Sequence, residues 1–178
     1  NTKWWRRIAC MRSDQLYERS VWKLRYFDTI IIYVTESGPK DQRIKKVANR
    51  DQDWAYNNYI TLGNELVLSP MFNPAAPMVT YMSYFKNLPR VYLLNIETGM
   101  QELVGDFPGM NFAPRFSPDG TKIIMSLAKD GNSDIYDMDI KSRLVDQLTS
   151  HPSIDTYPSD SSAETQITFT SDRSSTQQ

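Results

Sequence analysis

Residues that could carry catalysis or bind a metal are few in this chain. His151 is the single histidine and Cys10 the single cysteine, so the chain can form neither a histidine pair, nor a cysteine-rich zinc site, nor an internal disulfide. His151 has serines on both sides and Asp155 close by, which is the composition of a serine–histidine–aspartate triad. No Gly-x-Ser-x-Gly nucleophile elbow occurs in the chain, however. We therefore expect His151 to lie in a loop and no residue to be catalytic.

Two acidic turns have the composition of a metal or catalytic site. Residues 130–134 begin like a calcium-binding loop, which requires glycine at its sixth position and a bidentate glutamate at its twelfth. Those positions hold Ile135 and Lys141, so the pattern predicts a polar hairpin loop. Residues 117–120, Ser-Pro-Asp-Gly, are typical of a β-turn, because proline fixes φ at the second position and glycine accepts positive φ. We expect no bound metal and no cofactor.

Charge and hydropathy limit the classes of partner. The chain has 178 residues and a formal net charge of −1, which gives no electrostatic reason to bind nucleic acid or an anionic membrane surface. Apolar runs such as 30–32 and 66–68 are much shorter than the ~20 residues that cross a bilayer, so we expect no membrane insertion. The 40% content of hydrophobic residues is enough to build a packed core.

Short β-rich runs occupy most of the chain. The spacing of apolar residues predicts one helix from Trp4 to about Lys23. Strands are predicted after that helix at 29–35, 44–48, 79–84, 90–96, 122–127, 134–140 and 166–170. Turn residues separate these runs at short intervals. Many short strands with closely spaced turns predict an all-β sandwich, barrel or propeller.

A repeat of 44 residues favours a propeller among these folds. Pro70, Pro114 and Pro158 are 44 residues apart, and the run at 91–96 recurs at 135–140 with the same spacing. About four strands fit in one such repeat, which is the size of a propeller blade. The β-rich part of the chain holds roughly three and a half repeats, whereas closed propellers typically have about 4–8 blades. We therefore expect an open arc of three to four blades.

The segments before the repeated prolines are candidates for partner binding. They lie at 66–69, 110–113 and 154–157. The innermost strand of each propeller blade lines a central channel, so loops leading into these strands would rim the channel mouth and converge there. Convergent loops on a rigid scaffold are typical binding sites. The candidate residues are Ser69, Met110, Asn111, Phe112, Ala113, Asp155 and Thr156.

Several longer stretches resemble the TolB family of the Tol–Pal envelope system. They lie at 26–29, 36–41, 81–87, 90–99, 104–110, 113–120 and 171–173. The long run from Met82 to Gly120 is specific, whereas a Ser-Pro-Asp-Gly turn occurs in many propellers. Residues 5–9 and 17–19 are similar to the last helix of that family's N-terminal α/β domain. The resemblance implies the end of an α/β domain and its linker at 1–27, followed by an incomplete propeller of the six-bladed type at 28–178.

The resemblance also implies a non-enzymatic protein of the periplasm. Members of the family bind the peptidoglycan-associated lipoprotein Pal at the channel mouth, and they contact TolA through an N-terminal segment that is absent here. Together these proteins maintain the outer membrane and draw it inward during cell division, and some colicins use the same surface. The Pal-facing positions carried over by motif are Met110, Asn111, Ala113 and Thr156, which agrees with the argument from channel geometry.

Two enzymatic alternatives remain open. Propellers with similar repeats gate serine peptidases related to prolyl oligopeptidase, which would require a hydrolase domain with a nucleophile elbow outside this chain. A carbohydrate-acting propeller would require clustered carboxylates around the channel, and Asp155 is the one carboxylate expected there.

Overall fold

The computed structural model describes residues 2–21, 28–52, 57–63, 65–85, 88–105, 107, 111–129, 131–163 and 165–176. Within these ranges it contains one helix and thirteen strands. In chain order they are α1 (Thr2–Val21), β1 (Ile30–Ser37), β2 (Ile44–Asp51), β3 (Asn57–Tyr59), β4 (Leu66–Phe72), β5 (Met78–Phe85), β6 (Leu88–Asn95), β7 (Gln101–Gly105), β8 (Asn111–Phe116), β9 (Lys122–Lys129), β10 (Asn132–Asp139), β11 (Val145–Gln147), β12 (Asp155–Asp160) and β13 (Ile167–Ser171).

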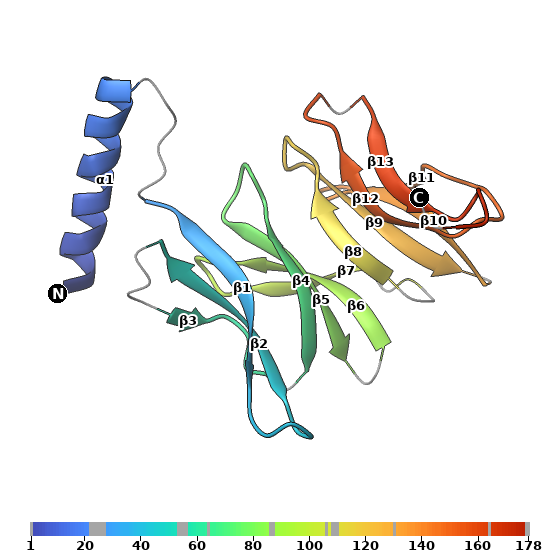
Figure 1. The fold of residues 1–178 in the computed structure, drawn as a ribbon, viewed down its shortest axis with the longest axis horizontal. Coiled ribbons are helices and arrows are strands. Elements are labelled where there is room, and N and C mark those ends of the chain that lie inside the picture. Colours follow the sequence, from blue (N-terminus) through green and yellow to red (C-terminus); the bar gives the residue numbers. More distant parts are fainter. Residues whose placement is uncertain are drawn as a thin grey trace.

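The strands form four antiparallel sheets that follow one another along the chain. Their orders are β1-β2-β3, β4-β5-β6-β7, β11-β10-β9-β8 and β12-β13. Each four-stranded sheet is a simple up-and-down meander, which is the form of a propeller blade. Figure 1 shows the sheets side by side in chain order, from the blue β1 to the red β13. The predicted fold, a partial all-β propeller preceded by one helix, is confirmed.

All seven predicted strands are present, and six further strands were not predicted. The missed strands are of two kinds. Strands β3, β7 and β11 are short, with three or five residues each, and they pair at the outer edge of their sheets. Strands β4, β8 and β12 each contain a proline in mid-strand, which ordinarily argues against a central strand and is accepted at a sheet edge. Their position at the other edge of each sheet explains why proline is tolerated.

The turn at 117–120 links β8 to β9 as predicted. The amide of Gly120 donates to the carbonyl of Ser117 at 2.9 Å, and Gly120 has a φ of +75°, a conformation that glycine adopts without steric cost. The carboxylate of Asp119 accepts from the amide and the hydroxyl of Thr121, at 2.9 and 2.7 Å. These bonds stabilise the turn, so Asp119 is a structural residue.

Two clusters of buried apolar side chains fill the spaces between successive sheets. The first includes Val47 of β2 and Tyr81 of β5, and so joins the first two sheets. The second includes Leu93 of β6 and Met125 of β9, and joins the second sheet to the third. Strand β9 is buried on both faces, because residues 123–127 are all buried. Blade-to-blade packing of this kind is the main source of stability in the fold.

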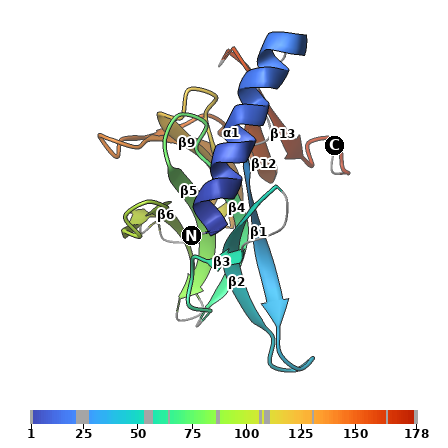
Figure 2. The same ribbon diagram turned by 90° about the vertical axis from the view of Figure 1, so that its left-hand side faces the viewer.

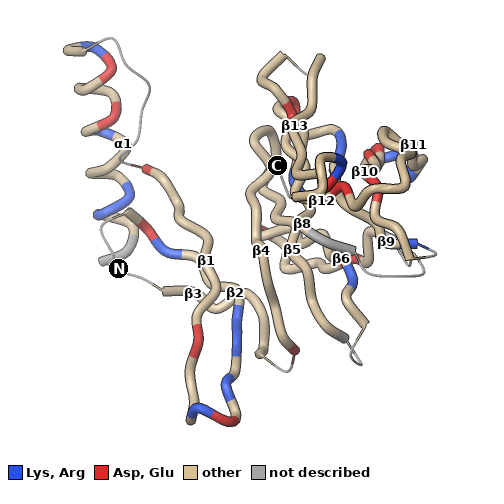
Figure 3. The backbone as a smooth tube through the Cα atoms, turned by 45° about the vertical axis from the view of Figure 1, so that its right-hand side comes forward, with Lys and Arg blue, Asp and Glu red and all other residues tan. Residues whose placement is uncertain are grey.

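Helix α1 stands apart from the sheets. It packs against none of the described strands; Figure 1 shows it beside the sheets, and Figure 2 shows it in front of them. Its polar links lead to Asp28, whose amide donates to the Asp14 carboxylate at 2.9 Å and whose own carboxylate lies 3.6 Å from Arg7. No helix in the described part of the chain is both long and apolar enough to cross a membrane. Charges of both signs occur along α1 and the β1–β2 hairpin (Figure 3).

Candidate functional site

Strands β4, β8 and β12 form the inner edge of the arc. Each is the first strand of its sheet and lies at the sheet's edge. Strand β8 contacts both β4 and β12, so the three lie side by side although their starts are 44 or 45 residues apart. Since each sheet repeats the same meander, the three inner strands all begin on the same face of the arc. We call the part of this face where β4, β8 and β12 begin the channel mouth.

The prediction that the segments before the prolines are loops is wrong. Leu66–Phe72, Asn111–Phe116 and Asp155–Asp160 are strands, so six of the seven candidate residues lie in the inner edge itself. The seventh, Met110, lies outside the described residues. The reason for the error is that these segments carry little alternation of polar and apolar residues, and they become strands by pairing with β5, β9 and β13.

The three inner strands share one backbone irregularity. Ser69, Ala113 and Tyr157 have positive φ values of 50°, 47° and 53°, and each precedes one of the repeated prolines. The pairing register shifts at the same place in each strand. Two residues of the inner strand therefore face one residue of the neighbouring strand, which is a β-bulge. The facing residues are Tyr81, Met125 and Phe169, as the flanking registers require.

This bulge stores strain at the inner edge. A residue with a Cβ atom in the left-handed region costs roughly 1–2 kcal/mol, and three residues at equivalent positions pay this cost here. Strain of this kind persists only where the surrounding structure imposes it, and it clusters at functional sites. The repeated prolines mark the place of the bulge in the sequence. The residues that bear the strain have no residue type in common, so the bulge could not be predicted from the sequence.

The candidate side chains differ in how far they are exposed to solvent. Ser69 is exposed, Thr156 is half-buried, and Ala113 is buried with 9% of its surface accessible. The side chains of Asn111 and Phe112 lie outside the described part. Tyr157, which was not predicted, is 67% exposed at the bulge of β12, and the neighbouring Ile154 is also exposed. The sequence analysis favoured small and polar residues at the channel mouth, so these two large side chains were not among the candidates.

Asp155 is the most enclosed candidate. Its carboxylate accepts from the guanidinium of Arg173 at 2.7 Å and has no exposed surface. Burial acts to raise the pKa of Asp155, but the hydroxyls of Ser171 and Thr149 together with Arg173 outweigh it and hold the pKa below its usual value. Asp155 is therefore an ionised structural residue that joins β12 to the turn after β13.

The composition of a triad around His151 does not become a catalytic geometry. The imidazole Nδ1 of His151 accepts from the amide of Ser153 at 3.1 Å, and His151 itself is exposed. The carboxylate of Asp155 is engaged with Arg173 instead. Among the described residues there is also no cluster of side chains suited to holding a metal ion. The arrangement at the channel mouth provides a shaped surface with hydroxyl and aromatic groups, which suits binding.

Comparison with known proteins agrees with this architecture. The family model described as the TolB beta propeller domain, PD40, matches residues 17–178. The chain belongs to the TolB propeller family. The Tol-Pal system protein TolB of Pelagibacter ubique is 66% identical over 61% of this chain, and that of Gluconobacter oxydans is 43% identical over 82% of it. The crystal structure of TolB from Acinetobacter baumannii superposes with a TM-score of 0.84 and 30% identity, over 97% of this chain and 43% of that one.

The similarity to TolB proteins covers only part of their length. The chain spans 24% and 32% of the two curated relatives. Propellers of enzymes share the arrangement of sheets at 14% identity, and that likeness shows the fold alone.

Proposed function

We propose that the protein is a non-enzymatic, periplasmic component of the Tol–Pal system that binds the lipoprotein Pal at the channel mouth. The observation that carries this proposal is the strained bulge repeated at Ser69, Ala113 and Tyr157. It shapes three adjacent inner strands into one surface, in a chain that is similar over 61% and 82% of its length to two proteins named for the Tol-Pal system. The proposed contact residues are the candidates other than Asp155, which is buried against Arg173, with Tyr157 added.

The remaining roles follow from the same assignment. TolA would contact a segment N-terminal to this chain, and colicins would use the same protein. Through Pal and TolA the protein would maintain outer-membrane integrity and constriction during cell division. Residues 1–27 would end an α/β domain and its linker, and the lack of contact between α1 and the described strands supports a boundary before residue 28.

The test is calorimetric titration of the complete protein with the periplasmic domain of Pal. We expect saturable heat at micromolar concentrations. Thr156→Arg places a long charged side chain on the half-buried mouth surface and should weaken binding at least tenfold. Thr98→Arg is the matched control, because Thr98 lies exposed in the β6–β7 turn at the opposite end of the sheet.

Two results would overturn the proposal. The first is no detectable heat at tens of micromolar with a wild-type protein that melts cooperatively. The second is equal weakening by Thr156→Arg and Thr98→Arg. Covalent labelling of the complete protein by a fluorophosphonate probe would instead indicate a peptidase whose propeller acts as a gate.

A further inference from the structure

The turn that leads into β12 lies at the channel mouth. Residues 148–154 join the end of β11 to the start of β12, and they contain His151, the single histidine of the chain. The proposed contact residues Thr156 and Tyr157 follow this turn directly. The shape of the turn therefore decides where the first residues of β12 lie at the mouth.

Neighbouring strands hold both ends of this turn. The amide of His151 donates to the carboxylate of Asp134 at 3.3 Å, and the carbonyl of His151 accepts from the side-chain amide of Asn132 at 2.6 Å. At the other end, the amide of Ile154 donates to the carboxylate of Asp172 at 2.8 Å. These bonds join the backbone of the turn to β10 and to the residues after β13, and none of them uses the imidazole.

The imidazole of His151 holds the middle of the turn. The amide of Ser153 donates to Nδ1 of His151 at 3.1 Å, and this bond spans Pro152 as an Asx turn does, with Nδ1 in the place of an asparagine oxygen. Nδ1 accepts only while the imidazole is neutral and carries its proton on Nε2, because both nitrogens of a protonated imidazole are donors. Protonation therefore breaks this bond.

Mild acid removes the imidazole bond and leaves the bonds at the two ends. Histidine ordinarily gains its proton between about pH 8 and pH 5, whereas carboxylates ordinarily stay ionised over that range. His151 is exposed, so a proton reaches it from solvent. The charged side chains on the elements around the turn are Lys129, Asp134, Asp146, Asp155, Asp172 and Arg173. Asp155 and Arg173 pair with each other, while Asp134 and Asp172 stay bound to the backbone of the turn.

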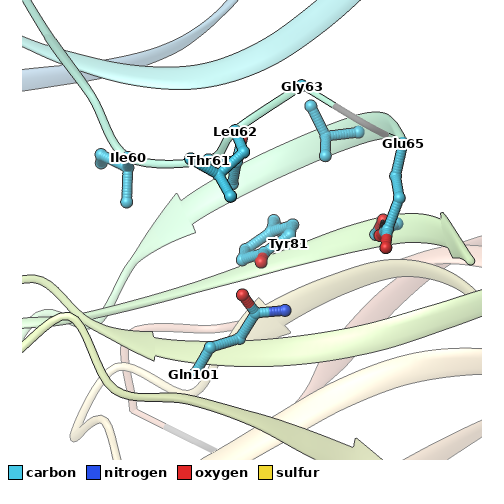
Figure 4. A pocket seen from close by; sticks show the side chains of 9 residues that line it. Ile60, Thr61, Leu62, Gly63, Glu65, Tyr81 and Gln101 are labelled. Atoms are coloured by element: carbon cyan, nitrogen blue, oxygen red, sulfur yellow. Dashed lines mark hydrogen bonds between the residues drawn. The ribbon is translucent and has the colours of Figure 1, made fainter.

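The corresponding turn two repeats earlier is shaped without an imidazole. Both turns begin with a threonine hydroxyl that accepts from the amide of a neighbouring strand at 3.0 Å: Thr61 from Val47, and Thr149 from Ile135. Position 63 therefore corresponds to position 151. Gly63 has a φ of +86°, which glycine adopts without steric cost. Figure 4 shows the segment 60–63 over a cavity of about 160 Å³, with Glu65 at one end. Because glycine has no titratable side chain, this turn is an internal control for effects of pH.

We propose that His151 is a positioning residue of the channel mouth, whose neutral imidazole orders the turn into β12 and whose protonation releases this turn and weakens partner binding. The affected surface is the start of β12, where Ile154 is 45% exposed. Loss of one hydrogen bond corresponds to a change in affinity of about three- to tenfold. That the partner is Pal rests on the proposed function, whereas the response of the turn to pH does not.

The turn is tested first without Pal, by NMR of the complete protein. The observable is the temperature dependence of the Ser153 amide proton shift, which is small when that amide is hydrogen-bonded. His151→Asn supplies an acceptor oxygen at the place of Nδ1, His151→Gln carries the same amide group one methylene further out, and His151→Ala has no acceptor. We expect a small dependence in His151→Asn at pH 7.5 and pH 5.5, and a large one in His151→Gln and His151→Ala at both. The wild type should change from small to large, while the amide of Val47, bound to Thr61, stays small. A small dependence in the wild type at pH 5.5 would overturn the proposal.

Calorimetric titration with Pal separates this inference from the proposed function. From pH 7.5 to pH 5.5, the affinity of the wild type should fall about three- to tenfold more than that of His151→Asn, a comparison that cancels titration elsewhere in either protein. Equal dependence on pH in the two proteins would overturn the inference and leave Pal binding intact. A turn that responds to pH in a protein that does not bind Pal would refute the proposed function and keep the role of His151 in the turn. Thermal melting of each variant establishes that it is folded.

Discussion

Replacing Ser69 by glycine should stabilise the protein, although glycine normally weakens a strand. Ser69 has a φ of 50°, and relief of this left-handed conformation is worth roughly 1–2 kcal/mol. Glycine loses more conformational freedom on folding, which costs about 0.5–1 kcal/mol. Because the Ser69 side chain is exposed, little burial is lost. The free energy of unfolding should therefore rise by about 0.5–1 kcal/mol, the difference between these two terms.

Two further glycine variants calibrate this prediction. Ser159→Gly makes the same chemical change in β12, at a residue that is not among those with positive φ. It should destabilise by about 0.5–1 kcal/mol, since only the entropy cost remains. Ala113→Gly relieves strain but removes a buried methyl group worth about 0.8 kcal/mol, so its effect should be close to zero. The expected order of stability is Ser69→Gly, then Ala113→Gly, then Ser159→Gly.

Urea unfolding of the complete protein, followed by far-ultraviolet circular dichroism, measures this order. A shift of the midpoint at constant slope reports a change in stability. If Ser69→Gly and Ser159→Gly destabilise equally, the conformation at Ser69 carries no strain and the argument from the repeated bulge is refuted.

The remaining predictions concern a buried ion pair and a buried apolar side chain. Asp155→Asn removes the charge bound by Arg173 and should cost about 1.5 kcal/mol at pH 7, the lower end for a charged hydrogen bond because Arg173 is 41% exposed. Since the folded-state pKa of Asp155 lies below its ordinary value, this stability is present above about pH 4 and is lost as the pH falls through the folded-state pKa. Urea unfolding from pH 7 to pH 3 should show the variant and the wild type converging, and a constant difference would contradict the assignment. Met125→Ala, at a residue with no exposed surface, should cost about 2–5 kcal/mol. Met100→Ala, at a residue that is 74% exposed, should cost less than about 0.5 kcal/mol, and equal midpoint shifts would refute the packing argument.

Strands with regular alternation and strong turns could be predicted from the sequence, whereas inner strands could not. Residues 122–127 are mostly apolar and follow a Ser-Pro-Asp-Gly turn, and they form β9 as expected. Strand β12 reads Asp-Thr-Tyr-Pro-Ser-Asp, which lacks both signals. It is a strand because β13 supplies the hydrogen bonds and because a bulge accommodates its proline.

The candidate site, too, was predicted from the sequence only in part. The repeated prolines located the inner edge, and Ser69 is exposed there as a binding surface requires. Asp155 was expected at the rim, but it is buried against Arg173, 18 residues away in the chain. Tyr157 was overlooked because its exposure follows from the bulge, which turns the side chain away from the alternation of the strand.

The sequence by itself determined the 44-residue period, the four-strand unit and the turns that end it, because these depend on residue types close together in the chain. Only the tertiary structure decided the sign of φ at Ser69, the partner of Asp155 and the cavity beside Glu65. Each of these depends on a segment distant in the chain: the register of β5 fixes the bulge, the turn after β13 supplies the guanidinium of Arg173, and the segment 60–63 covers the cavity. Periodicity specifies a repeat, but contacts between repeats specify how one repeat differs from the next.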